Sequence, residues 1–121
     1  INKNSIIYDD YLFEPCGYSL NGLIDSGYFT IHVTPQEICS YVSFETNVIL
    51  SDYTNLVHKV LDCFKPQRFT FVLTSNCSSI PYHVQDRFSK MYSEQAQLGN
   101  GYFIHFANFH EANCSTISKV V

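Results

Sequence analysis

The sequence has no tryptophan, one methionine and few charged residues. Charged side chains make up 15% of the 121 residues, against roughly 25% in typical soluble chains. Lys and Arg together number 7 and form no run, so nothing indicates a nucleic-acid surface. The chain also lacks an apolar stretch of about 18 residues, and we therefore predict no membrane-spanning helix and no membrane partner.

Paired cysteines and nucleophile motifs are absent as well. The five cysteines are odd in number and form no Cys-x-x-Cys pair, which argues against a metal site and a disulfide framework. We expect reduced thiols and a cytoplasmic protein. No Gly-x-Ser-x-Gly elbow supports hydrolase chemistry. The chain starts at Ile1 and no signal-peptide pattern follows, so we expect a fragment or a processed piece.

Aromatic residues, in contrast, are abundant: nine Tyr and ten Phe. The length predicts one domain, residues 1–121, with little interior for nineteen rings. A dense core is one explanation. We favour a second apolar face that packs on another domain or subunit.

The spacing of apolar residues predicts an α+β fold. The pattern predicts a strand over 11–19 that ends in a Gly-containing turn, further strands over 28–34, 39–49, 68–75 and 102–109, and a weaker strand pattern over 87–97. Residues 1–10 suggest a leading strand or arm, and the tail from Glu111 should be frayed. Helical spacing predicts a helix over 52–64, with Ser51 as N-cap and Pro66 as the stop. We expect a mostly antiparallel β-sheet with helices on one face.

The hairpin of 28–34 and 39–49 places polar residues on one face. With a short connection, we expect the pairs His32 with Tyr41, Thr30 with Ser43 and Tyr28 with Glu45. A neutral imidazole can act as a base, but only beside a group to deprotonate. The residues alone leave an ordinary exposed polar face as the alternative.

Other candidate residues are equally open on sequence alone. Ser19 could be a turn serine that bonds its own backbone. Cys16 is better explained as a buried core thiol than as a nucleophile. Phe13 could stack on a flat heterocycle or join the core. Glu45 needs a cation or donors if it is buried, and has no assigned role if it is exposed.

Three sequence blocks narrow the choice among these roles. Phe-Glu-Pro-Cys-Gly-Tyr-Ser-Leu-Asn-Gly spans 13–22, Tyr-Phe-Thr-Ile-His-Val-Thr-Pro spans 28–35, and Ser-Tyr-Val-Ser-Phe-Glu-Thr-Asn spans 40–47. Together they resemble the second half of eukaryotic S-adenosylmethionine decarboxylase, the pyruvoyl enzyme of polyamine synthesis. The resemblance covers most of residues 11–75 and is weaker afterwards.

The resemblance implies a fold and a cofactor. The family's fold is a four-layer αββα sandwich of two similar halves, and this chain would be one half. The proenzyme cleaves itself at a Glu-Ser bond, and that serine becomes the pyruvoyl group. This carbonyl forms a Schiff base with the substrate amine and takes up the electrons left by departing carbon dioxide. The serine and a proton-donating cysteine would lie upstream of Ile1.

The resemblance also implies residue roles. Phe13 would stack on the adenine of the substrate. Ser19 and His32 would act in self-processing, where the histidine removes the α-proton of an ester intermediate and the serine assists by hydrogen bonding. Glu45 would join a buried charge network that binds putrescine in some members.

One position departs from the family. The family usually has a glutamate after His-x-Thr-Pro that holds the ribose hydroxyls, and this chain has Gln36, with Glu37 next to it.

The partners implied are S-adenosylmethionine, the N-terminal half or β chain of the same proenzyme, putrescine, and a homodimer or heterodimer. Two alternatives remain open: a non-catalytic regulatory partner subunit, and an unrelated ligand-binding α+β domain.

Overall fold

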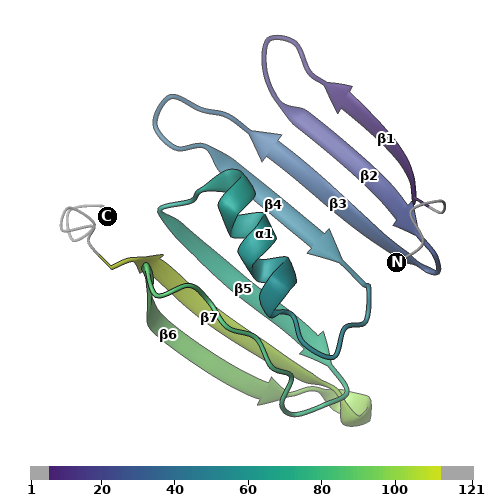
Figure 1. Cartoon of the computed structure of the whole chain (residues 1–121), viewed down its shortest axis with the longest axis vertical. Coiled ribbons are helices and arrows are strands. Elements are labelled where there is room, and N and C mark those ends of the chain that lie inside the picture. Colours follow the sequence, from purple (N-terminus) through teal and green to yellow (C-terminus); the bar gives the residue numbers. More distant parts are fainter. Residues whose placement is uncertain (1–5, 113–121) are drawn as a thin grey trace. The chain divides into compact units, whose positions relative to one another are not determined.

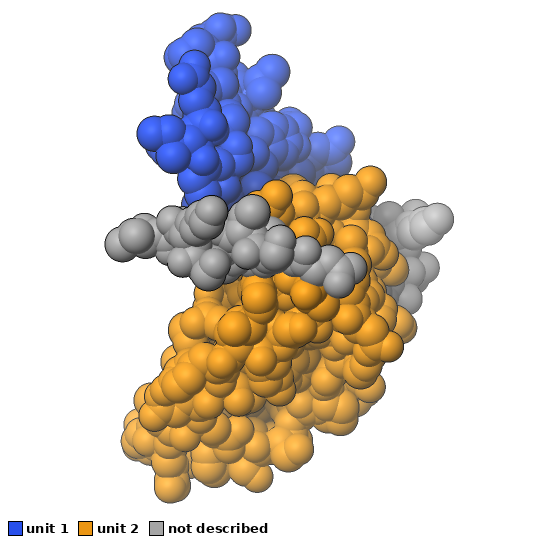
Figure 2. Space-filling view, turned by 90° about the vertical axis from the view of Figure 1, so that its left-hand side faces the viewer, with its two compact units in different colours: residues 1–50 blue, residues 51–121 orange. Residues whose placement is uncertain are grey.

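A computed structural model describes residues 6–112 of the chain (Figure 1). The chain forms two compact units, residues 1–50 and residues 51–121, which Figure 2 colours separately. Each contains its own antiparallel sheet. The mostly antiparallel α+β class predicted from sequence is confirmed, while the single domain over 1–121 stays a prediction.

The first unit is a four-stranded antiparallel sheet in the order β1-β2-β3-β4 (Figure 1). Its strands follow one another along the chain: β1 (Ile6–Leu12), β2 (Tyr18–Ile24), β3 (Gly27–Thr34) and β4 (Tyr41–Thr46). A tight turn with Asp25 at φ 52° joins β2 to β3, and Asp is among the few non-Gly residues that adopt this conformation readily. The predicted strands at 28–34 and 39–49 are confirmed, the second in shorter form.

The predicted strand 11–19 is wrong, because the chain turns in the middle of it. Strand β1 ends at Leu12, and the Phe13 N–H donates to the Gly17 carbonyl at 2.9 Å. Gly17 has φ 119°, a conformation that L side chains rarely adopt, and Pro15 has no N–H for a sheet ladder. Pro15 and Gly17 were therefore the turn signals within an otherwise strand-like stretch.

The hairpin register differs from the predicted one by two residues. His32 lies opposite Ser43, Thr30 opposite Glu45, and Tyr41 opposite Thr34. The connection, residues 35–40, is longer than the one we assumed, so each residue of β3 meets a partner two positions further along β4. An even shift keeps every side chain on its original face. The predicted shared face of His32, Tyr41, Ser43 and Glu45 is therefore retained.

The opposite face of this sheet carries the apolar residues. Five partly buried side chains share it: Phe29, Ile31, Val33, Val42 and Phe44. Gly22 also lies on this face, opposite Phe29. A Cβ at position 22 would lie 2.2 Å from the Phe29 ring, so the absence of a side chain makes room for that ring.

The second unit packs one helix on a three-stranded sheet. Helix α1 (Thr54–Phe64) accompanies strands β5 (Arg68–Ser75), β6 (Phe88–Gln97) and β7 (Phe103–Glu111), in the sheet order β5-β7-β6. The buried core joins two helix residues to three from β6 and β7: Val57, Leu61, Phe88, Ala107 and Phe109. All three strands were predicted. Within the described residues Glu111 still belongs to β7, while the rest of the predicted frayed tail, from 113 on, lies outside them.

The helix ends as predicted but begins differently. Lys65 adopts a left-handed conformation with φ 48°, its N–H donates to the Leu61 carbonyl, and Pro66 follows. At the other end, Ser51 is not the N-cap. The Asp52 carboxylate accepts the Thr54 N–H at 2.7 Å, and hydrogen bonds to Thr54 hold the pKa of Asp52 below its ordinary value. Asp52 stabilises the helix start because its side chain reaches a backbone donor that the helix cannot pair.

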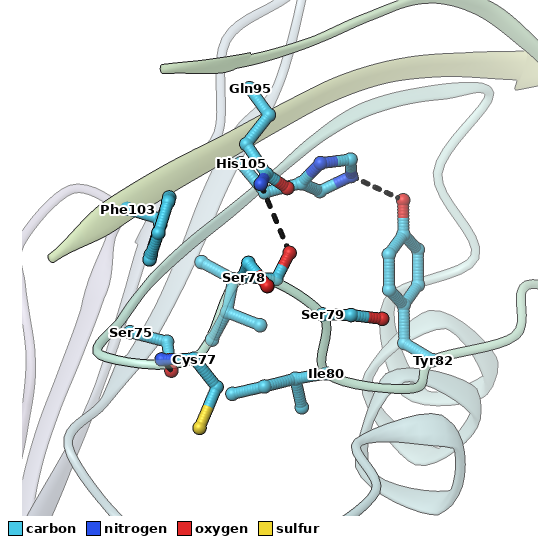
Figure 3. A pocket seen from close by; sticks show the side chains of 10 residues that line it. Ser75, Cys77, Ser78, Ser79, Ile80, Tyr82, Gln95, Phe103 and His105 are labelled. Atoms are coloured by element: carbon cyan, nitrogen blue, oxygen red, sulfur yellow. Dashed lines mark hydrogen bonds between the residues drawn. The ribbon is translucent and has the colours of Figure 1, made fainter. Parts of the chain in front are cut away.

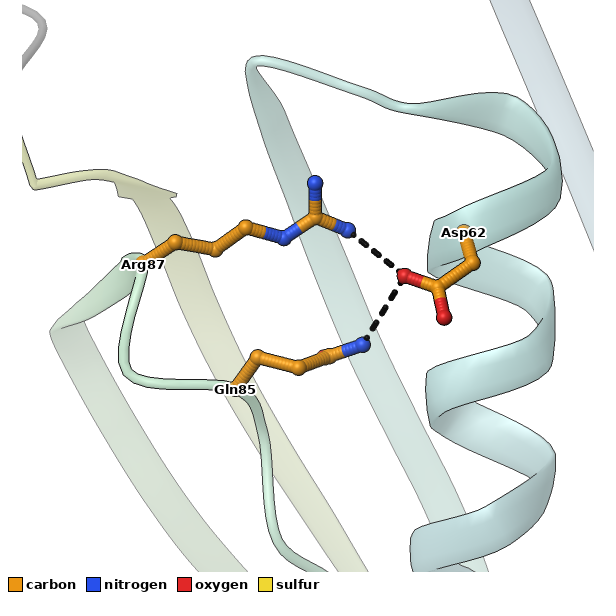
Figure 4. Close-up of polar contacts among 3 residues, drawn as sticks. All are labelled: Asp62, Gln85 and Arg87. Atoms are coloured by element: carbon orange, nitrogen blue, oxygen red, sulfur yellow. Dashed lines mark hydrogen bonds and ion pairs between the residues drawn. The ribbon is translucent and has the colours of Figure 1, made fainter.

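A polar cluster joins the helix to the segment before β6. The Asp62 carboxylate accepts from Arg87 Nη2 at 3.0 Å and from Gln85 Nε2 at 3.3 Å (Figure 4). Both charged side chains are exposed, so this ion pair contributes little to stability. Among residues 6–112, no helix is long and apolar enough to cross a membrane.

Candidate active site

A serine–histidine pair stands on the polar face of the first unit. Ser19 on β2 and His32 on β3 are direct cross-strand partners. Ser19 Oγ and His32 Nδ1 lie 2.9 Å apart, within hydrogen-bond distance. His32 is exposed and Ser19 is partly buried. The hydrogen bond to Ser19 therefore orients the imidazole through one ring nitrogen, and the rest of the ring is exposed on this face.

The serine can select the tautomer of His32. If Nδ1–H donates to Ser19 Oγ, the other nitrogen, Nε2, is unprotonated and can accept a proton. A hydrogen bond to one ring nitrogen in this way determines the role of the other. The pair thus has the geometry of an oriented general base, with the serine orienting the ring.

Two turns meet at one end of the same sheet. Cys16, in the turn between β1 and β2, places its Sγ 3.9 Å from the Pro35 carbonyl oxygen, in the connection between β3 and β4. Gln36 and Glu37 follow Pro35 and are exposed. The end of the sheet therefore brings the Phe13 turn close to the connection that carries Gln36 and Glu37. Cys16 is exposed rather than buried as expected, because it lies in a turn beyond the strand ends.

Phe13 does not join a core, since 46% of its surface is exposed. Its ring contacts Tyr11 edge to face, with centroids 4.7 Å apart and planes at 66°. Tyr11 is the cross-strand partner of Ser19 and so shares the polar face with His32. Sequence reasoning missed Tyr11, although its two-residue spacing from Phe13 was a usable signal.

Glu45 lies on the same polar face, beyond the pair. It stands opposite Thr30, two positions along the strands from His32 and Ser43. Its side chain is exposed in this chain. The face therefore runs from the turn end, past Ser19 and His32, to the carboxylate of Glu45.

On the opposite face of the first sheet, two ionisable side chains are hydrogen-bonded to each other. The Tyr18 hydroxyl donates to Asp10 Oδ2 at 2.9 Å, and this hydrogen bond raises the pKa of Tyr18 above its ordinary value. Within the part of the chain that the structure describes, no group of three or more metal-ligating side chains occurs. The four cysteines in that part are free thiols: Cys16, Cys39, Cys63 and Cys77.

Comparison with known proteins identifies the family of this fold and face. The adenosylmethionine decarboxylase family matches residues 1–118. A Dictyostelium discoideum S-adenosylmethionine decarboxylase proenzyme is 62% identical over 65 residues, which is 54% of this chain and 17% of the relative. A Drosophila melanogaster proenzyme of the same name is 48% identical over 87 residues, 71% of this chain and 25% of the relative.

A solved structure agrees with the sequence matches. The Trypanosoma brucei AdoMetDC-delta26 monomer superposes with a TM-score of 0.81 at 29% identity, over 90% of this chain and 48% of that one. The chain therefore belongs to the adenosylmethionine decarboxylase family. It spans about a quarter or less of the length of these two curated relatives.

Proposed function

We propose that this chain is the C-terminal part of a pyruvoyl-dependent S-adenosylmethionine decarboxylase, a cytoplasmic lyase. The whole protein would remove carbon dioxide from S-adenosylmethionine and supply aminopropyl groups for spermidine and spermine. The observation that carries the proposal is the hydrogen bond between Ser19 and His32, 2.9 Å long, on a face of matching sequence blocks. The test is self-processing of the full-length proenzyme with His32 replaced, which is set out in the Discussion.

The chemistry of this face fits the formation of a pyruvoyl group. When present, that group supplies an electron-withdrawing carbonyl for decarboxylation. In this chain, His32 Nε2 would take the α-proton of the ester intermediate formed at the upstream serine. Ser19 would hold the ring through Nδ1. A base must stand within hydrogen-bond reach of the proton that it abstracts, and the exposed side of His32 leaves that position accessible.

The substrate would bind at the turn end of the sheet. Phe13 presents an exposed ring on which an adenine can stack, and Tyr11 supports that ring from its edge. Gln36 and Glu37 follow Pro35 and would reach the ribose hydroxyls. Glu45, further along the face, would pair with a cation such as putrescine once the face is covered, because a buried carboxylate requires a partner.

The N-terminal half or β chain of the same proenzyme is the proposed partner for this face, and a homodimer or heterodimer of the whole protein is a separate proposal. The exposed polar face around His32 supports this proposal. A regulatory, non-catalytic partner subunit is the second candidate, and Gln36 is the observation that favours it. An intact Glu-Ser site and a downstream cysteine in the preceding sequence would favour the enzyme over the regulator.

Isolated residues 1–121 should release no carbon dioxide from S-adenosylmethionine. The expected result follows from the missing pyruvoyl-forming serine, which the family places upstream of Ile1. The measurement is release of labelled carbon dioxide by the purified chain, with the processed full-length enzyme as positive control. Turnover by the 121-residue chain above the buffer rate would refute this prediction.

Restoring a carboxylate at position 36 should strengthen substrate binding. In the full-length enzyme we expect Gln36→Glu to lower KM for S-adenosylmethionine by about tenfold, because a charge-assisted hydrogen bond is worth roughly 1–1.5 kcal/mol more than a neutral one. The neighbouring Glu37→Gln is the matched control. If Glu37→Gln raises KM and Gln36→Glu leaves KM unchanged, Glu37 rather than position 36 binds the ribose.

A further inference from the structure

A cavity of about 200 Å³ opens on the second unit. Its base is formed by β5 and β7, through Leu73 and Ser75 on one strand and Phe103 and His105 on the other. The segment of residues 76–82 passes over these strands and forms the opposite wall (Figure 3). No residue of the proposed decarboxylation site lines this cavity.

The segment over the cavity is attached to the sheet at both ends. At its start, the Cys77 N–H donates to Ser75 Oγ at 3.0 Å. At its end, the Tyr82 hydroxyl and His105 Nε2 are hydrogen-bonded at 2.8 Å (Figure 3). The ring of Tyr82 also stacks on Phe71, with centroids 4.2 Å apart. These contacts fix both ends of the segment relative to β5 and β7.

A third contact holds the middle of the segment. Gln95 Nε2, on β6, donates to the Ser78 carbonyl oxygen at 3.0 Å (Figure 3). This bond uses the backbone of Ser78, and both Ser78 and Ser79 are among the residues that line the cavity. Hydrogen bonds to residues of β5, β6 and β7 thus fix the position of the segment over the cavity.

The lining residues determine which ligands could enter. Within residues 6–112, the lining includes no Lys, Arg, Asp or Glu. Burial raises the pKa of Tyr82, and burial followed by the charge of Lys90 lowers the pKa of His105, so both shifts favour the uncharged side chain. The lining itself would offer a charged ligand no counter-ion, and Lys90 Nζ, which is outside the lining, lies 6.0 Å from the centroid of the Tyr82 ring.

The size and polarity of the cavity limit the ligand further. A cavity of about 150 Å³ accommodates a benzene molecule, so this one has room for a single ring with a small substituent. Leu73, Ile80 and Phe103 provide apolar contacts for such a ring. Serine hydroxyls both donate and accept, which suits a substituent that does the same.

We propose that this cavity is a binding site for an uncharged, single-ring aromatic compound with an amide-like hydrogen-bonding group. The ring packs between Leu73, Ile80 and Phe103, and the amide faces the hydroxyls of the 76–82 segment. Such a site gives the protein a second ligand, distinct from the charged S-adenosylmethionine and putrescine.

The test is a titration of the full-length protein with three probes that share one ring, followed by ligand-observed NMR. Benzamide is neutral and polar, benzoate has the same shape with a negative charge, and toluene lacks the polar group. We expect benzamide to bind with a Kd of about 1 mM or tighter, a typical affinity for so small a ligand. Benzoate and toluene should each bind at least about tenfold more weakly.

Two variants that fill the cavity locate the site. Ser79→Phe and Ser78→Phe place a ring in the cavity from the exposed segment and should each abolish benzamide binding, while Ser51→Phe, outside the lining, should not. Retained circular dichroism in either filling variant shows that it is folded. Benzoate binding equal to that of benzamide, no binding of benzamide, or binding that survives in a folded filling variant would each overturn the proposal.

Discussion

Replacing His32 by alanine in the full-length proenzyme should stop self-processing at the ester stage while the fold is retained. A positioned base contributes roughly 10²- to 10⁴-fold to a proton transfer, so cleavage should slow by that factor. The ring is exposed on the face opposite Ile31 and Val33, so its removal opens no cavity among them. The measurement is the appearance of the two chains on a denaturing gel.

Two companion variants separate the base from its support. Ser19→Ala removes the 2.9 Å hydrogen bond but keeps the imidazole, so processing should slow by about tenfold, the equivalent of one hydrogen bond. His83→Ala removes an exposed histidine from the second unit and should process normally. Hydroxylamine, which cleaves esters, should split the His32→Ala protein if the ester has accumulated. Normal self-cleavage of that variant would reject the assignment, and loss of soluble protein would indicate a structural histidine.

Truncating Phe109 should give the largest loss of stability in the second unit. Phe109 is 5% exposed and stacks on Phe69 with centroids 4.8 Å apart and planes at 5°. A buried Phe→Ala change typically costs about 3–5 kcal/mol, because the lost burial is accompanied by an unfilled cavity. We therefore expect Phe109→Ala to lower the free energy of unfolding of the full-length protein by that amount, measured by urea titration.

A surface variant provides the control for this measurement. Tyr92 is 52% exposed on β6, so Tyr92→Ala should change the free energy of unfolding by less than about 1 kcal/mol. A similar cost for both variants would mean that the cluster around Phe109 is not the core of this unit.

The sequence by itself determined the elements with strong local signals. Alternation in Arg68–Ser75 predicted β5 with the observed bounds, and Pro66 correctly predicted where α1 ends. These signals are local, because side-chain period and the missing proline N–H act within a few residues. The three sequence blocks likewise indicated the family, together with Ser19 and His32 as candidate site residues.

Tertiary structure alone decided how those residues meet. The pairing of Ser19 with His32 depends on the tight turn at residues 25–26, which sets the register of β2 against β3. The two-residue shift of Ser43 toward His32 depends on the length of the connection at residues 35–40. Turn geometry sets strand register, and apolar alternation is equally well satisfied by registers that differ by two. The cavity beneath residues 76–82 could not be predicted from sequence, because it depends on side-chain contacts with β5, β6 and β7, which lie far apart in sequence.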